Sequence, residues 1–177
     1  KDRDGTRLSA YFLSACTMYP VSRKWSLGPG VDYASGGGTA ARSRRFDPLY
    51  GTPHKFWGYL DYFYVADGFG NNGLADYYLK TRFKARENLL VTLDAHEFTT
   101  SNAVTAGDGT PLSRNLGTEL DLVVSYHLTK TIHLEGGYCT LFATPTLASE
   151  AVKNTPNARL QANWAYFMIS IKPDLLK

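Results

Sequence analysis

The feature that most constrains the fold of this chain is a two-residue alternation of apolar and polar side chains. Residues 117–130 show it best, with one apolar and one mainly polar parity: Leu120, Leu122, Val124, Tyr126 and Leu128 against Glu119, Asp121, Val123, Ser125 and His127. Successive side chains of a β-strand point to opposite faces of the sheet. The segment is therefore expected to form a strand with one apolar and one polar face.

The same alternation predicts further strands, and the connections between them alternate in length. Strands are expected at about residues 7–19, 25–34, 74–85, 89–98, 132–142 and 163–172. Short turns at residues 20–24, 86–88 and 129–131 alternate with long connections at residues 35–72, 99–116 and 145–161. This order is typical of bacterial outer-membrane barrels, with short periplasmic turns and long external loops. We therefore expect an all-β fold, an antiparallel transmembrane β-barrel with residues 1–177 in a single domain.

The strand count depends on the aromatic segment Phe56–Tyr64. If this segment crossed the membrane, two long connections would follow one another and the sidedness would invert. We therefore assign residues 35–72 to an extracellular or lumen-entering loop that narrows the mouth. Seven strands remain, and single-chain bacterial barrels have even counts, so we expect the chain to be the C-terminal portion of a larger barrel. The alternative, in which Phe56–Tyr64 crosses, gives eight strands that close alone.

Composition excludes some classes and leaves others open. No run of about 18 apolar residues occurs, so no transmembrane helix is expected. Aromatic residues make up 14% of the chain, which suits interfacial girdles and also a sugar-binding β-sandwich. The two cysteines, Cys16 and Cys139, lie in expected strands, and we expect small packed side chains there rather than a disulfide.

Several segments, in the right order, resemble the alginate export family of outer-membrane barrels, in the version found among Bacteroidota. The resemblance covers about residues 25–173. Its motifs are Phe46-Asp47-Pro48-Leu49-Tyr50-Gly51-Thr52-Pro53-His54-Lys55-Phe56-Trp57-Gly58-Tyr59-Leu60-Asp61, Asp76-Tyr77-Tyr78-Leu79, Leu93-Asp94-Ala95-His96-Glu97-Phe98, Gly117-Thr118-Glu119-Leu120-Asp121-Leu122, Leu134-Glu135-Gly136-Gly137-Tyr138 with Phe142-Ala143, and Asn163-Trp164-Ala165-Tyr166. The resemblance implies a large antiparallel barrel whose lumen passes an acidic polysaccharide or another small solute. Alginate exporters line a constriction with arginine, whereas this chain offers three cations interleaved with carboxylates.

The three cations are Lys80, Arg82 and Lys84, and they belong to the parity that is expected to face the lumen. A basic row inside a narrow pore favours anions, but interior cations can instead pair with carboxylates on neighbouring strands. Both readings remain open. The expected pore-lining residues are Asp76, Tyr78, Lys80, Arg82, Lys84, Asp94, His96, Glu119, Asp121, His127 and Glu135.

The long loop carries the second set of candidate residues. Its arginines match phosphate and carboxylate geometry and could attract an anionic glycan or lipopolysaccharide, or could be a solvated charge run. Its aromatic residues are expected to pack the loop into the mouth, with sugar stacking as the alternative. The expected mouth-loop residues are Arg42, Arg44, Arg45, Phe46, Asp47, Tyr50, His54, Lys55 and Trp57.

Enzymatic and metal-binding motifs are missing from the sequence. It contains no nucleophile elbow, phosphate-binding glycine loop or HExxH motif. His96, His127 and His133 share the interior parity, and we expect them to form hydrogen bonds there, with metal binding as the lesser alternative. We expect no enzyme activity, cofactor, metal or nucleic-acid partner.

The sequence thus predicts a passive outer-membrane channel for anionic solutes or acidic polysaccharide. The expected partners are outer-membrane lipid and lipopolysaccharide, with an anionic glycan or small solute as the cargo. The main alternative is a structural barrel with an occluded lumen that holds a partner protein in the outer membrane. A third reading is a soluble sugar-binding β-sandwich.

Overall fold

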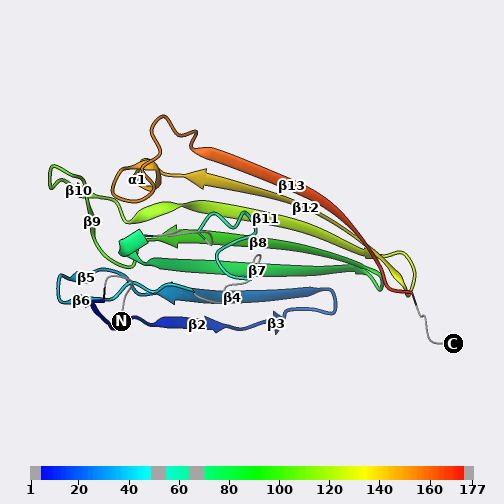
Figure 1. Ribbon diagram of the computed structural model, residues 1–177. Coiled ribbons are helices and arrows are strands. Elements are labelled where there is room, and N and C mark those ends of the chain that lie inside the picture. Colours follow the sequence, from blue (N-terminus) through cyan, green and yellow to red (C-terminus); the bar gives the residue numbers. More distant parts are fainter. Residues whose placement is uncertain (1–4, 49–54, 64–69, 174–177) are drawn as a thin grey trace.

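The computed structural model describes residues 5–48, 55–63 and 70–173. One antiparallel sheet dominates it, as the alternation predicts (Figure 1). Its strands are β2 (Phe12–Cys16), β3 (Tyr19–Pro20), β4 (Trp25–Ala34), β7 (Leu74–Arg86), β8 (Leu89–Thr99), β11 (Asn115–His127), β12 (Ile132–Ala143) and β13 (Gln161–Ile171).

Neighbours in the chain are neighbours in the sheet. The order is β13-β12-β11-β8-β7-β4-β2, and β3 also pairs with β4, so the sheet has the seven strand positions expected from the sequence. All of these pairs are antiparallel. The strands β2 and β13 form the two edges, and among the described residues the sheet does not close into a barrel.

The first expected strand, residues 7–19, is wrong as a single element. It is broken into β1 (Arg7–Leu8), which lies outside the main sheet, and the short strands β2 and β3. The Thr17 N–H donates to the Pro29 carbonyl at 3.2 Å, but Pro29 has no N–H to return a bond. A proline facing its neighbour interrupts the ladder at that position, and β2 accordingly ends at Cys16.

The two faces of the sheet differ sharply in burial. We call the face that carries Leu79, Leu93 and Leu122 the apolar face, and these side chains are 44%, 46% and 41% exposed. We call the opposite one the polar face; there Glu119 is 0% and Asp121 1% exposed. The remaining sheets are small, β1-β6-β5 and β10-β9, and within the described residues no second sheet packs over the apolar face.

The connections segregate to opposite ends of the strands (Figure 1). Short turns join β3 to β4, β7 to β8 and β11 to β12 at one end, the turn end. The loop end carries the longer connections, with the small elements β5 (Gly38–Thr39), β6 (Arg42–Ser43), η1 (Gly70–Asn72), β9 (Val104–Thr105), β10 (Pro111–Leu112) and α1 (Pro145–Ala148). Within the described residues, no helix has the length and apolarity needed to span a membrane.

Residues 55–63 contain no strand and lie against the polar face, so Phe56–Phe63 is an excursion from the sheet, as expected. We call residues 55–63 the inner segment. Its Trp57 is 2% exposed, and the Phe63 and Phe98 ring centroids lie 4.6 Å apart. The apolar core of the molecule is therefore small: Ala34, Trp57, Phe63, Leu74, Phe98, Leu116, Leu141 and Leu147.

Both cysteines are free and lie in strands, as expected. Cys139 on β12 is buried and Cys16 on β2 is exposed. The expectation of a packed side chain therefore holds for Cys139 and is wrong for Cys16, because β2 is an edge strand with a neighbour on one side only.

Candidate functional site

A row of ionisable side chains crosses the centre of the polar face. The antiparallel register places His96 of β8 beside Tyr78 of β7 and beside Glu119 of β11. It also places Asp94 opposite both Lys80 and Asp121. Directly opposite residues of paired strands project to the same face, so the pleat alone gathers these groups.

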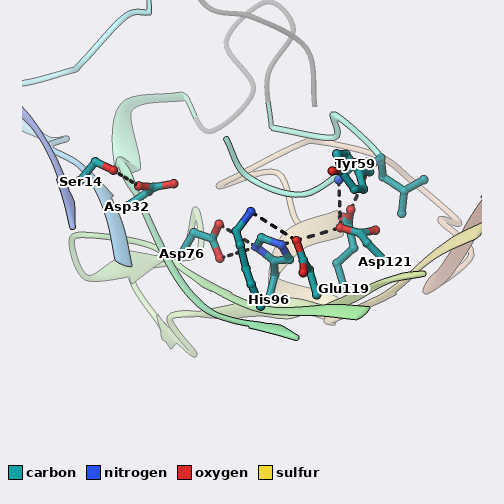
Figure 2. A network of polar contacts seen from close by, with 10 residues as sticks. Ser14, Asp32, Tyr59, Asp76, His96, Glu119 and Asp121 are labelled. Atoms are coloured by element: carbon teal, nitrogen blue, oxygen red, sulfur yellow. Dashed lines mark hydrogen bonds and ion pairs between the residues drawn. The ribbon is translucent and has the colours of Figure 1, made fainter. Parts of the chain in front are cut away.

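His96 lies between two carboxylates (Figure 2). Its Nδ1 lies 2.9 Å from Asp76 Oδ2 and 3.0 Å from Asp76 Oδ1. Its Nε2 lies 3.7 Å from Asp121 Oδ2. Both ring nitrogens therefore face carboxylate oxygens, an arrangement that fixes the orientation of the ring.

Backbone amides of the inner segment bind the same row. The Tyr59 N–H donates to Asp121 Oδ2 at 3.1 Å, and the Leu60 N–H donates to Glu119 Oε1 at 2.9 Å (Figure 2). Two main-chain hydrogen bonds to neighbouring carboxyl groups of the sheet therefore hold the inner segment against the polar face.

A glycine allows this close approach. Gly58 has φ +80°, and a Cβ built on it would lie 2.3 Å from Glu119 Oε1. Trp57 and Asp61 also have positive φ, 63° and 53°. Non-glycine residues in this region are uncommon and cost free energy. The inner segment thus adopts its path because contacts with the sheet compensate for this local cost.

Tyr59 adds a hydroxyl to this region. Burial raises the pKa of Tyr59, and the nearby charges of Asp94 and Asp121 raise it further. The hydroxyl therefore stays protonated at neutral pH and can donate a hydrogen bond.

Two aromatic rings of the polar face lie over glycines of the neighbouring strand. Tyr78 covers Gly30, where an added Cβ would lie 2.3 Å from a ring carbon, and Lys80 Nζ lies 5.2 Å from the Tyr78 ring centroid. Tyr166 of β13 covers Gly137 in the same way and donates its hydroxyl proton to Glu135 Oε1 at 2.7 Å. Such aromatic–glycine pairs pin strand register.

Six of the predicted pore-lining residues form one cluster: Asp76, Tyr78, Asp94, His96, Glu119 and Asp121. Lys80 extends it through an ion pair with Asp94, with Nζ 3.3 Å from Oδ2. Of the two readings of the cations, interstrand pairing therefore describes Lys80.

The other predicted pore-lining residues lie nearer the turn end. Arg82 and Lys84 are exposed, and Lys84 Nζ lies 2.7 Å from Glu87 Oε2 in the adjacent turn. Glu135 accepts a hydrogen bond from Ser125, at 2.9 Å. The rings of His127 and His133 stack with centroids 4.6 Å apart.

The mouth-loop residues do not form one site. Phe46 stacks on Phe12, with centroids 5.3 Å apart, in the loop-end core. Arg45 Nη2 lies 3.6 Å from Asp47 Oδ2, and Arg42 and Arg44 lie on or beside β6. Lys55 and Trp57 belong to the inner segment, whereas Tyr50 and His54 lie outside the described residues.

Two members of the polar face were missed as candidates. Asp32 is 3% exposed and accepts a hydrogen bond from Ser14 Oγ at 2.5 Å. Tyr166 covers Gly137 as described above. Both lie on the polar parity of expected strands, so parity was the signal that could have identified them.

The chemistry open to this cluster is hydrogen bonding and charge pairing. Buried carboxylates are stable only when they are paired or hydrogen-bonded; here His96, Lys80 and the inner-segment amides supply those partners. Across residues 5–48, 55–63 and 70–173, no group of His, Cys, Asp and Glu could hold a metal ion. A recess between the cluster and the inner segment is lined by Lys55, Gly58, Tyr59, Lys80, Asp94, His96 and Asp121.

Comparison with known proteins adds no assignment. No protein-family model matches the chain, and no curated protein matches it significantly. The resemblance to the alginate export family therefore stays a prediction. The two faces of the sheet and the inner segment are therefore the features of the molecule that bear on its function.

Proposed function

We propose that this protein is an outer-membrane β-barrel channel that passes anionic solutes or acidic polysaccharide by passive diffusion. The observation that carries this proposal is the burial of carboxylates on one face and the exposure of large apolar side chains on the other. Phe167, Ile169 and Leu122 are 69%, 56% and 41% exposed, whereas Glu119 and Asp76 are 0% exposed. A water-soluble sheet has the opposite arrangement.

Lipid is the environment that fits the apolar face. Exposed apolar surface costs about 25 cal/mol per Å² in water, and continuous apolar patches mark membrane or protein interfaces. The exposed residues of this face extend from β4 to β13 and include Trp25, Leu27, Leu79, Leu93, Leu122, Tyr138, Phe142 and Phe167. In the proposed arrangement, acyl chains contact this face and water contacts the polar face.

The polar face would then line the lumen, with the inner segment as its narrowest part. The tether from Glu119 and Asp121 to the Tyr59 and Leu60 amides supports a fixed constriction rather than a free loop. Anion preference would come from the exposed cation Arg82, which has no acidic partner within 4 Å among the residues the structure describes. Lys80, paired with Asp94, would contribute less.

Ion selectivity in planar bilayers tests this function. The purified protein should insert and conduct, with a reversal potential in a KCl gradient that indicates chloride preference. Arg82→Glu should shift the reversal potential towards potassium, because it reverses a lumenal charge. Lys130→Glu is the matched control; it makes the same charge change in an exposed turn and should leave the potential unchanged. Equal shifts from both variants would contradict the lumenal assignment.

A second candidate is an occluded barrel that scaffolds a partner protein. The buried Trp57 and Phe63 of the inner segment favour it, because a well-packed segment can seal a lumen. This candidate predicts detergent-dependent solubility with no conductance, and association with another outer-membrane protein. Conductance by the unmodified protein would exclude it, and stability without detergent would contradict both membrane proposals.

A further inference from the structure

A basic face lies at the loop end, away from the polar-face cluster. β6 pairs with β5 on one side and, in parallel, with β1 on the other. Arg7 pairs directly with Arg42 in the parallel register. Directly paired residues share a face of a sheet, and so do residues two positions apart. Arg7, Arg42 and Arg44 therefore project from one side of this small sheet.

The opposite strand leaves space beside these guanidinium groups. The Arg44 N–H donates to the Gly37 carbonyl at 2.9 Å, so a residue without a side chain faces Arg44. Thr39 faces Arg42 and adds a hydroxyl. A recess of about 180 Å³, which is open to solvent, is lined by Gly38, Thr39, Arg42 and Arg44.

Among the described residues, the charges on this face have no carboxylate partner. In residues 5–48, 55–63 and 70–173, no carboxylate lies within ion-pair distance of Arg7, Arg42 or Arg44. Arg45, on the other parity, does have a carboxylate nearby, that of Asp47 at 3.6 Å. Like charges directly opposite one another destabilise a sheet. A bound anion would remove this repulsion.

We propose that Arg7, Arg42 and Arg44 form a binding site for a phosphate group of a phosphorylated glycolipid. A phosphate monoester carries about two negative charges and three acceptor oxygens, which suits three guanidinium groups better than a single carboxylate does. Guanidinium forks bind phosphate through paired hydrogen bonds. The lipid source rests on the proposed function, since it requires the loop end to lie at the outer leaflet.

Binding of lipid A tests the site. The probes are vesicles of phosphatidylcholine containing bisphosphorylated lipid A, the same vesicles with dephosphorylated lipid A, and inorganic pyrophosphate in solution. The triple variant Arg7→Gln/Arg42→Gln/Arg44→Gln should weaken binding of bisphosphorylated lipid A by at least about tenfold, because it removes charge-assisted hydrogen bonds. Dephosphorylated lipid A should bind the unmodified protein and the triple variant with equal, weak affinity.

A matched control removes the same charge at the other end. Arg23, Arg86 and Lys130 are exposed near the turn end, and the triple variant Arg23→Gln/Arg86→Gln/Lys130→Gln should bind lipid A within about twofold of the unmodified protein. Equal loss in both triple variants would overturn the site, because it would indicate general attraction between charges. Equal binding of dephosphorylated lipid A would also overturn it.

Two further results separate the ligand source and the two proposals. Pyrophosphate binding that depends on the three arginines, without lipid A binding, would overturn the lipid assignment in favour of a soluble phosphate compound. Lipid A binding by a protein that does not conduct would uphold the site while the channel proposal fails. Normal conductance with no phosphate binding of any kind would overturn the site and leave the channel proposal intact.

Discussion

Leu122 and Ser125 lie three positions apart on β11 and face opposite sides of the sheet. Leu122 is 41% exposed on the apolar face. Ser125 donates a hydrogen bond to Glu135 Oε2 at 2.9 Å on the polar face. If lipid covers the apolar face, a charge at these two positions meets different surroundings.

We expect Leu122→Arg to impair membrane assembly and Ser125→Arg to be tolerated. A cation on the lipid face costs about 2–4 kcal/mol at mid-depth, whereas an arginine at position 125 would lie beside Glu135. Heat-modifiable gel migration of membrane fractions measures the folded proportion. Equal damage from the two variants would contradict the assignment of faces.

Gly137 and Gly136 give a second matched pair at this scale. A Cβ at Gly137 would lie 2.1 Å from a Tyr166 ring carbon, whereas at Gly136 the nearest atom would be 3.8 Å away. Gly137→Ala should displace the Tyr166 ring and lower the free energy of unfolding by about 1–3 kcal/mol. Gly136→Ala should change it by less than about 0.5 kcal/mol. Urea unfolding followed by tryptophan fluorescence compares the two variants.

At the scale of the element, the inner segment depends on carboxylates far away in sequence. Leu60 and Glu119 are 59 positions apart, and Tyr59 and Asp121 are 62 apart. Backbone donors leave no residue-type signal, so the sequence offered no means of pairing them. The sequence likewise does not indicate that Arg7 and Arg42 lie side by side, because that contact depends on the parallel register of β1 and β6.

Glu119→Ala should loosen the inner segment. It removes the oxygen that accepts the Leu60 N–H, so hydrogen exchange at the Leu60 amide should accelerate by about tenfold. Glu135→Ala is the control, since the bonds of Glu135 go to Ser125 and Tyr166. Unchanged Leu60 exchange in the first variant would show that the tether does not hold the segment.

Features set by local periodicity were predictable from the sequence, and features set by pairing were less so. The sequence places Leu120 and Asp121 on opposite faces because strand geometry alone separates neighbours, and the structure agrees. Pro29 lies within the expected strand 25–34, but its effect falls on the partner strand β2, which ends opposite it. Which strand lies opposite a proline depends on the register, and a single segment does not encode the register.

At the scale of the whole molecule, the short turns at one end of the strands and the long connections at the other make the two ends of the sheet different. Gly107 lies in the exposed connection between β9 and β10, where an added Cβ would meet no atom within 4 Å. Lys130 lies in the exposed turn between β11 and β12. The proposed function places position 107 outside the cell and position 130 in the periplasm.

Labelling of intact cells tests this orientation. In a Cys16→Ser/Cys139→Ser background, Gly107→Cys should react with a membrane-impermeant maleimide in whole cells. Lys130→Cys should react only after the outer membrane is permeabilised. Labelling of both positions in intact cells would contradict a membrane-spanning sheet, and labelling of position 130 alone would invert the proposed orientation.

The two edge strands also limit how a membrane could accept this sheet. Six successive antiparallel steps lead from β2 to β13, so both edges run in the same direction. Hydrocarbon cannot satisfy unpaired amides and carbonyls. Joining these edges directly would create a parallel seam in an otherwise antiparallel wall. In a closed wall that is antiparallel throughout, each edge strand pairs with a strand of opposite direction. Such a wall therefore requires an odd number of additional strands between β2 and β13.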